Sequence, residues 1–305
     1  ADLKGRDQYT PAHQVMSRAV VAISDQDDNR EAFETLEKHR IKAAPVVNSA
    51  GMVVGTLTRD DVVRMELLRP AKGSDGHLMV AAAMGISQNV EAQARALAEL
   101  GVSAIVLDTA HGHQRRMLEA LKRIRASVRI DVPIVAGNVC TPEGTRALIE
   151  AGADIVKVNV GPGAMCTTRM QTGVGRPSFS SVLHCAREAR KHGKHVWADG
   201  GVRAPRDVAL YLAAGASRVM VGTMLAGTYE SPGDIMEDHD GAAYKENYGM
   251  ASARAVKDRT SGSDAFEMAK KRFFREGISS SRIYLQEGRE SVGAILVALL
   301  TGLQS

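Results

Sequence analysis

A lone cysteine on a glycine-rich loop is the strongest chemical signal in this sequence. Residues 154–160 are rich in β-branched side chains and predict a buried strand, which runs into a Gly-Pro-Gly turn at 161–163. Cys166 follows this turn, and the glycines and proline within 173–177 argue against a simple helix directly after it. Because α/β enzymes keep reactive groups on loops at the carboxyl ends of strands, Cys166 is a candidate nucleophile.

Two interpretations of Cys166 remain open on its local sequence. A lone cysteine is most often a buried and inert thiol. A nucleophile is favoured by the glycine-rich loop and by the neighbouring Arg169, whose positive charge would favour the thiolate. The other cysteines, Cys140 and Cys185, lie at a strand-to-helix junction and within a predicted helix, and we interpret both as structural.

A regular alternation of strands and helices predicts the scaffold that positions this loop. The apolar strands are nearly continuous, which indicates a parallel sheet covered on both faces. Strands are predicted at 78–86, 104–108, 133–138, 154–160, 195–199 and 217–222, with helices at 90–100, 115–127, 142–151, 180–192 and 205–214.

The predicted fold class is α/β, of the (β/α)₈ TIM-barrel type. The sequence supplies six strand–helix units, whereas a closed barrel of this type needs eight, so the chain apparently lacks the first two. Either the chain is an N-terminally truncated piece, or the sheet is open or is completed by another molecule. Unpaired sheet edges would favour self-association, and we expect a homo-oligomer, a tetramer or octamer.

A separate module precedes this alternation, and residues 70–77 form a linker by composition. Helix 28–39, strand 44–47, strand 52–58 and helix 60–68 together resemble one cystathionine-β-synthase (CBS) motif. We therefore predict a partial CBS-like module at 1–70 and a barrel-type catalytic domain at 71–305.

The resemblance to a CBS motif leaves the ligand of this module open. It implies that Thr58 and Asp61 hold a nucleotide ribose, and hence a purine nucleotide effector. CBS motifs work in pairs and one convincing copy is present, so a packing or interface module that binds nothing is an equal alternative.

Composition restricts the partners of the chain. The net charge of +4 and pI of about 9.0 come without a Lys/Arg block, and only 4% of residues are aromatic. Nucleic acid is therefore not expected as a partner, whereas an anionic small molecule fits. No apolar run is long enough for a membrane span and no signal peptide is apparent, so we expect a cytoplasmic protein without a membrane partner.

Polar or glycine-rich residues follow every strand of the central alternation. Any one of them is explained equally well as a helix N-cap, but together on one rim they predict an active site. Gly200-Gly201 and Gly222-Thr223 follow the last two strands, where barrels commonly bind phosphate through backbone N–H groups. Asp199 would repel a phosphate and is better placed for ribose hydroxyls, which implies a nucleotide with its base toward Cys166.

Several segments resemble, in order, the signature blocks of the IMP dehydrogenase and GMP reductase family. They are DTAHGH at 108–113, AGNV at 136–139, GPGAMCTTRMQTGVGRP at 161–177, WADGGVR at 197–203, VMVGTMLAGTYESPG at 219–233 and YKENYGMAS at 244–252. The resemblance implies that Cys166 adds to C2 of the purine of a nucleoside 5′-monophosphate. It also implies that Thr168 belongs to a proton relay at the leaving group.

The resemblance further implies a set of binding residues. The nucleotide would contact Gly163, Ala164, Asp199, Gly201, Gly222, Thr223, Tyr248, Gly249, Met250 and Ala251. The nicotinamide side would be formed by Asp108, His111 and Asn138, and K⁺ would bind backbone carbonyls of Gly161, Gly163 and Cys166. Ala164 departs from the family pattern, which has a phosphate-binding serine at this position.

The resemblance favours a reductase over a dehydrogenase. Dehydrogenases of the family carry an Arg-Tyr pair on a flap, and this sequence contains no such dipeptide. Tyr248 before Gly249 is similar to reductases, although Ala253 replaces the usual reductase glutamate. Glu276 in the flap region is a candidate relay carboxylate with Thr168, or else a solvated acid at a helix end.

The overall pattern most resembles the CBS-containing actinobacterial branch that we associate with GMP reductase activity. It implies an NADPH-dependent reduction of GMP to IMP. An IMP dehydrogenase that uses NAD and a non-catalytic purine-nucleotide-binding regulator are the alternatives. A Schiff-base lyase is disfavoured because Lys157 lies within a predicted strand rather than at its end.

Overall fold

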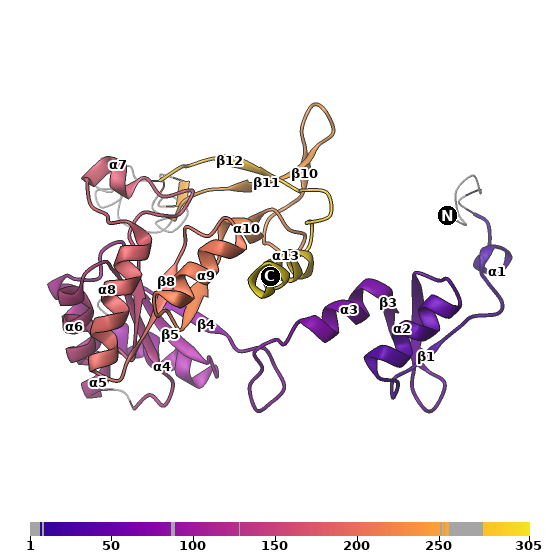
Figure 1. Cartoon of the computed structure of the whole chain (residues 1–305), viewed down its shortest axis with the longest axis horizontal. Coiled ribbons are helices and arrows are strands. Elements are labelled where there is room, and N and C mark those ends of the chain that lie inside the picture. The colour runs from indigo at the N-terminus through magenta and orange to yellow at the C-terminus, as the bar shows by residue number, and fades with distance from the viewer. Residues whose placement is uncertain are drawn as a thin grey trace. The chain divides into compact units, whose positions relative to one another are not determined.

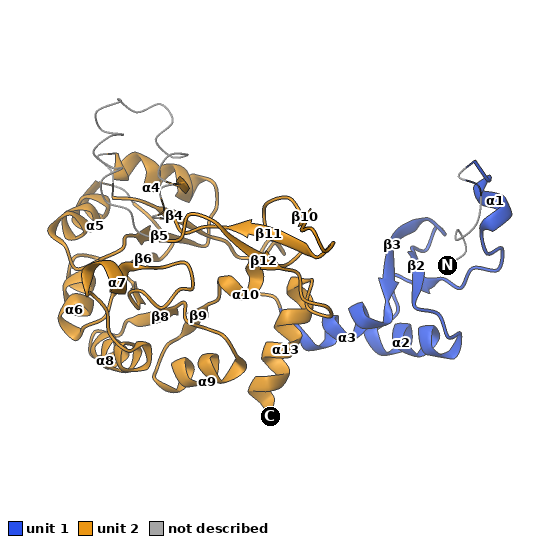
Figure 2. Ribbon diagram, turned by 90° about the horizontal axis from the view of Figure 1, so that it is seen from above, with its two compact units in different colours: residues 1–69 blue, residues 70–305 orange. Residues whose placement is uncertain are grey.

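The computed structural model describes residues 7, 9–86, 89–127, 129–250, 252, 254–255 and 277–305. The chain divides into two compact units, residues 1–69 and residues 70–305, which are coloured separately in Figure 2. Among the described helices, none has the length and apolar character needed to cross a membrane.

As far as it is described, the first unit contains a small three-stranded sheet and three helices, of which the second and third pack against the sheet. Strand β1 (Ile23–Ser24) pairs parallel with β2 (Ala43–Val47), which pairs antiparallel with β3 (Val53–Thr58). The helices are α1 (Ala12–Val15), α2 (Asn29–Lys38) and α3 (Arg59–Leu67). The predicted order of helix, strand, turn, strand and helix matches this arrangement.

Thr58 and Asp61 have a structural role at the start of α3. The Thr58 hydroxyl oxygen accepts the Asp61 N–H at 3.1 Å, and the Asp61 carboxylate accepts the Thr58 N–H at 3.2 Å and its hydroxyl at 2.5 Å. These contacts form a capping box, which satisfies free donors in the first turn of a helix. The capping role accounts for both residue types without a bound nucleotide.

The second unit is built on a curled parallel sheet with strand order β4-β5-β6-β7-β8-β9 (Figure 1). The strands are β4 (Ala81–Met84), β5 (Ala104–Asp108), β6 (Ile134–Val139), β7 (Ile155–Val158), β8 (His195–Asp199) and β9 (Arg218–Met220). The connecting helices are α4 (Val90–Glu99), α5 (Arg115–Ser127), α6 (Pro142–Glu150), α8 (Ser178–Lys191) and α9 (Pro205–Ala213). Six parallel strands were predicted, and this α/β architecture is consistent with a TIM-barrel-like domain.

Two apolar layers hold this sheet in place. Side chains alternate along a strand, so Ile105 and Leu107 face the helices and pack with Leu121 of α5 in the main core. All three are fully buried, and truncating such a side chain to alanine costs about 2–5 kcal/mol. Val106 and Trp197 face the opposite side and form a smaller cluster.

The inner face of the sheet becomes polar at its carboxyl end. In the strand register Asp108 pairs with Gly137, Gly137 with Lys157, and Lys157 with Trp197. A Cβ at Gly137 would lie 2.4 Å from the Lys157 carbonyl oxygen, so β6 and β7 approach closely only because residue 137 is glycine. The sheet therefore sets a lysine and two aspartates, at 108 and 199, near one rim.

The described part of the unit also contains a separate antiparallel sheet and three further helices. The strands are β10 (Met236–Glu237), β11 (Ala243–Asn247) and β12 (Ser281–Tyr284), and the helices are α7 (Thr168–Thr172), α10 (Thr223–Ala226) and α13 (Val292–Gln304). Helix α7 corrects the prediction that no simple helix follows Cys166 directly. It has 5 residues and ends at Gly173, whose φ of 69° terminates the helix in the left-handed region.

Candidate active site at the carboxyl ends of the strands

The loop after β7 presents the Cys166 thiol to solvent. Cys166 is exposed, and its N–H donates to the Gly163 carbonyl at 3.0 Å. Its Sγ lies 3.1 Å from Oγ1 of Thr168, whose side chain is buried at the start of α7. The structure therefore brings together the predicted nucleophile and the predicted relay hydroxyl. The third predicted catalytic residue, Glu276, lies outside the described residues.

Arg169 holds the backbone of this loop. Its Nε donates to the Val160 carbonyl at 2.9 Å, and its terminal nitrogen donates to the Arg176 carbonyl at 2.7 Å. A Cβ at either Gly161 or Gly175 would lie 2.6 Å from the Arg169 side chain, so both glycines make room for it. The guanidinium thus joins the two ends of the loop, and the expectation that its charge favours the Cys166 thiolate stays a prediction.

Two consecutive backbone N–H groups donate hydrogen bonds to the residues on either side of Cys166. The Gly277 N–H donates to the Thr167 hydroxyl oxygen at 2.6 Å, and the Ile278 N–H donates to the Met165 carbonyl at 3.1 Å. The Gly249 N–H in turn donates to the Ile278 carbonyl at 2.8 Å. We call residues 277–278 the clasp, because they fix the backbone immediately before and after the nucleophile.

Replacing Thr167 with valine tests the clasp. The Gly277 N–H would lose its acceptor, and an unpaired, partly buried amide costs about 1–3 kcal/mol in the free energy of unfolding. Thr167→Ser keeps the hydroxyl and should lose much less. Urea denaturation measures the stability, and hydrogen exchange at Gly277 reports the bond itself. Unchanged exchange at Gly277 in Thr167→Val would contradict this assignment.

Three of the other residues predicted to contact the nucleotide have different surroundings. Gly249 packs against the loop, since a Cβ there would lie 3.0 Å from the Met165 carbonyl oxygen. Tyr248 is half-buried with the Arg254 guanidinium 4.6 Å from its ring centroid, and Met250 is exposed. Ala251, the fourth predicted residue, lies outside the described residues.

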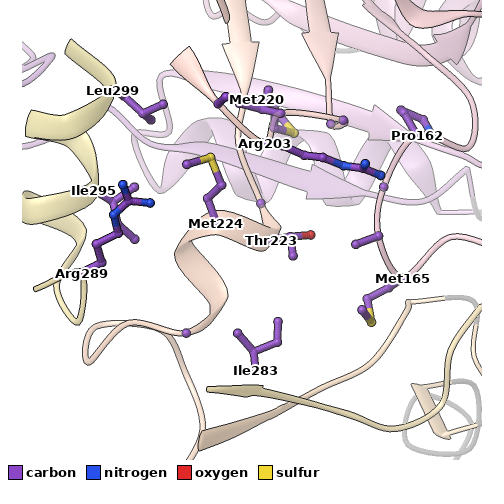
Figure 3. Close-up of a pocket in the computed structure, with 18 of the residues that line it drawn as sticks. Pro162, Met165, Arg203, Met220, Thr223, Met224, Ile283, Arg289, Ile295 and Leu299 are labelled. Carbon is purple, nitrogen blue, oxygen red and sulfur yellow. The ribbon is translucent and has the colours of Figure 1, made fainter. Parts of the chain in front are cut away.

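A cavity of about 880 Å³ opens next to the Cys166 loop (Figure 3). It brings together six of the residues that were predicted to contact the nucleotide, which are Gly163, Ala164, Asp199, Gly201, Gly222 and Thr223. Its far wall is apolar and includes Ile295 and Leu299 of α13. The cavity is therefore bounded by the strand ends on one side and by α13 on the other.

Glycine at position 201 is required by both conformation and space. Its φ is 76°, and a Cβ would lie 3.0 Å from the Pro162 side chain and 3.0 Å from the Tyr211 hydroxyl. The backbone N–H groups of Gly201 and Gly222 have no acceptor within the described part of the chain. Free amides at the cavity wall are suitable donors for an anion.

Three arginines that the sequence reasoning missed also line the cavity: Arg203, Arg282 and Arg289. Figure 3 shows the Arg203 side chain extending toward Pro162, whereas Arg289 lies beside Ile295 at the other end. Guanidinium groups bind phosphate oxygens in a bidentate manner, so this wall complements an anionic ligand. The signal for Arg203 was its position at the end of the WADGGVR segment.

The residues predicted for the nicotinamide side separate into two groups. Asn138 donates from Nδ2 to Asp199 Oδ2 at 2.9 Å, and Asp108 lies 3.0 Å from Lys157 Nζ, so both belong to one polar cluster with Asp199. His111 is exposed, and its ring centroid lies 6.5 Å from that of His113. Neither Asp108, Asn138 nor His111 lines the cavity described above.

Lys157 was considered from the sequence only as a Schiff-base candidate, and its ion pairs were not predicted. It is 3% exposed, and its Nζ forms ion pairs with both Asp108 and Asp199. The available signal was a lysine inside an otherwise apolar strand, since lysine is almost never fully buried without a charged partner. Side-chain oxygens of Asn138 and Asn159 in the same region are buried without a partner among the described residues.

Cys166 and Cys185 should differ sharply in reactivity. Burial raises the pKa of the Cys185 thiol to about 12, whereas Cys166 is exposed. Because the thiolate is the reactive form, iodoacetamide at pH 8 should modify Cys166 and spare Cys185 in the folded protein. Peptide mass spectrometry measures both, with the urea-unfolded chain as the control in which Cys185 also reacts. Equal modification of the two thiols in the folded protein would refute this assignment.

A family model and two known proteins match most of the chain. Residues 17–305 match the IMP dehydrogenase / GMP reductase domain. The chain is 50% identical over 301 residues to GMP reductase from Mycobacterium tuberculosis, covering 99% of this chain and 63% of that protein. It is 41% identical over 275 residues to inosine-5′-monophosphate dehydrogenase from Halalkalibacterium halodurans, covering 90% and 56%.

A solved structure has a similar fold. A cysteine-to-alanine variant of GMP reductase from Trypanosoma brucei in complex with guanosine 5′-monophosphate matches with a TM-score of 0.69 at 34% identity, covering 99% of this chain and 62% of that chain. The chain thus spans less than two thirds of the length of each of these relatives. The resemblance inferred from the sequence segments is confirmed: the chain belongs to the IMP dehydrogenase / GMP reductase family.

Proposed function

We propose that the protein is a GMP reductase, which converts GMP to IMP and ammonia with NADPH. The observation that carries this proposal is the placement of the exposed Cys166 thiol 3.1 Å from the Thr168 hydroxyl, on a loop that also walls the cavity. The identity of 50% to a GMP reductase, against 41% to an IMP dehydrogenase, supports the same activity.

The proposed reaction begins at Cys166. Its sulfur forms a bond to C2 of the guanine ring, the bond from C2 to the exocyclic nitrogen breaks, and ammonia leaves with a proton delivered through Thr168. When bound, NADPH would supply a hydride to C2, and the bond between the Cys166 sulfur and C2 would then break to restore the thiolate. The balance is GMP, NADPH and two protons giving IMP, NADP⁺ and ammonium.

The cavity residues orient the nucleotide for this step. The free amides of Gly201 and Gly222, with Arg203 nearby, are proposed to hold the 5′-phosphate. The Asp199 carboxylate lines the same cavity and is proposed to accept the ribose hydroxyls. Since Pro162 and Gly163 contact the Gly200-Gly201 turn, a phosphate bound there would be held at a fixed distance from the Cys166 loop.

The serine that the family uses for phosphate is absent here. Ala164 lines the cavity but offers no hydroxyl, so the phosphate would rely on backbone amides and guanidinium groups. Arginine makes charge-assisted hydrogen bonds that are roughly twice as strong as neutral ones, which offsets the loss of one hydroxyl donor. Thr223, at the start of α10 and in the same wall, carries the next available hydroxyl.

The nicotinamide is proposed to lie on the side of Asp108, His111 and Asn138. The buried and unpaired Oδ1 of Asn138 is an acceptor of the kind that a carboxamide N–H would satisfy. A monovalent cation, K⁺, is proposed to bind carbonyls of Gly161, Gly163 and Cys166. The Gly163 carbonyl already accepts the Cys166 N–H and retains a second lone pair for such an ion.

The remaining assignments stay predictions. They are the relay role of Glu276, the cytoplasmic location, the homo-oligomer and a purine nucleotide effector at the first unit. The last is weakly supported, because Thr58 and Asp61 are already paired with each other in the capping box.

A product assay tests the proposed function. The protein is incubated with GMP or IMP, each with NADPH, NADH, NADP⁺ or NAD⁺, and the nucleotides are resolved by mass. We expect IMP from GMP with NADPH and loss of absorbance at the reduced-nicotinamide band. XMP formed from IMP with NAD⁺ would replace the proposal with the dehydrogenase. Nucleotide binding by calorimetry without any turnover would instead support the non-catalytic regulator.

A further inference from the structure

One buried lysine lies between the two carboxylates that the proposed function assigns to different ligands. The Lys157 side chain is 4% exposed, and its Nζ lies 3.0 Å from Asp108 Oδ1 and forms a hydrogen-bonded ion pair with Asp199 Oδ2. Asp108 was predicted on the nicotinamide side and Asp199 on the ribose side. The ammonium group therefore connects the two halves of the site.

This connection spans four adjacent strands. Asp108 ends β5 and Asp199 ends β8, whereas Lys157 lies in β7, and Asn138 of β6 donates to the same Asp199 oxygen at 2.9 Å. Asp199 Oδ2 is thus held by two donors. No partner within the described residues contacts Asp199 Oδ1, which leaves this oxygen for a ligand.

Asp108 is arranged in the same way. Its Oδ1 is held by Lys157, and its Oδ2 has no partner in the described part of the chain. About half of the Asp108 side chain is exposed, against about a fifth of Asp199, so both carboxylates can reach a ligand. In each carboxylate one oxygen faces the lysine and the other remains available.

The charge balance makes the lysine necessary for this geometry. Without it, two carboxylates would face each other across the space that one ammonium now fills, and like charges repel strongly where little water enters. A single neutral donor, Asn138, would remain. Its Nδ2 donates to Asp199, and not to Asp108, and it is shared with the Asn159 carbonyl at 2.7 Å. We therefore expect both carboxylates to turn away from their present positions when the charge of Lys157 is removed.

We infer that Lys157 is a positioning residue that fixes Asp199 for the nucleotide and Asp108 for the nicotinamide at the same time. The inference rests on the proposed function for the identity of the two ligands. This role differs from that of a packing residue. A positioning role predicts that one substitution weakens the binding of two chemically different ligands together.

The test uses two neutral substitutions and one conservative substitution. Lys157→Met and Lys157→Gln should each raise the Michaelis constants for GMP and NADPH by about tenfold, which corresponds to about 1.4 kcal/mol per ligand. Lys157→Arg should return both constants to within about threefold of wild type, because a guanidinium can also bridge two carboxylates. Thermal denaturation identifies which variants are folded, and the glutamine variant serves if the methionine variant is not.

Lys194→Met is the matched control. Lys194 pairs with Asp154 at 2.8 Å near the opposite end of β7 and β8, so its loss affects an ion pair of the same strands without touching the site. Its Michaelis constants should stay at the wild-type values. A folded Lys157→Gln protein with both constants within twofold of wild type would overturn the inference, as would a change confined to one ligand.

Calorimetry separates this inference from the proposed function. The dissociation constant of GMP can be measured without NADPH and without turnover. If the wild-type protein binds GMP but reduces nothing, the proposed reductase is wrong. In that case a tenfold larger dissociation constant for GMP in Lys157→Gln still supports the role at Asp199, and an unchanged constant rejects it.

Discussion

Replacing Cys166 with alanine is expected to abolish turnover and to leave GMP binding within a few-fold of wild type. The sulfur is the one protein group that bonds to the purine in the proposed reaction, and removing a covalent nucleophile typically lowers the rate by roughly 10⁴-fold or more. Binding should persist because the phosphate and ribose residues, including Gly201 and Asp199, belong to other strand ends.

Two measurements together test this expectation. Absorbance at the reduced-nicotinamide band gives the rate, and calorimetry with GMP gives the dissociation constant. Cys140→Ala is the control, since Cys140 is half-buried at the end of β6 and is not proposed to react. Residual activity above about one per cent in Cys166→Ala would show that another group performs the chemistry.

Replacing Gly201 with alanine should specifically weaken the binding of GMP. The new Cβ would meet Pro162 and Tyr211 at 3.0 Å, and the φ of 76° costs an L-residue about 1–2 kcal/mol. The turn must therefore shift, and the amide at 201 moves with it. We expect the Michaelis constant for GMP to rise by tenfold or more, while the constant for NADPH changes little.

Gly193→Ala provides the matched control for this substitution. Gly193 has a φ of 63°, but a Cβ there would have nothing within 4 Å, and the residue precedes β8 at the opposite end of the strand. It carries similar backbone strain without the contacts at the cavity. If the two variants raised the Michaelis constant for GMP equally, the effect would be general destabilisation rather than loss of the phosphate site.

The sequence predicted the parallel sheet of the second unit and its connecting helices well because their periodicity is strong. The predicted strand at 104–108 and helix at 115–127 agree with the structure at both ends. Strand 78–86 was predicted too long, since β4 covers only Ala81–Met84. Apolar composition cannot mark where backbone pairing stops, so strand ends are less certain than strand existence.

The site was only partly predictable for a different reason. Cys166, Asp199 and Gly201 could be found because each follows a strand within a recognisable segment. The pairing of Lys157 with Asp108 and Asp199, like the contact of Thr167 with Gly277, depends on which side chains meet after folding. The same is true of the hydrogen bonds from Arg169 to the backbone of the loop, which residue type alone does not indicate.

A crystal structure of the protein soaked with GMP is the most direct test of the central claim. We predict the phosphate at the amides of Gly201 and Gly222, the ribose at Asp199, and the Cys166 sulfur in contact with C2 of guanine. A complex in which the sulfur points away from the purine, or in which GMP occupies another part of the surface, would contradict the account.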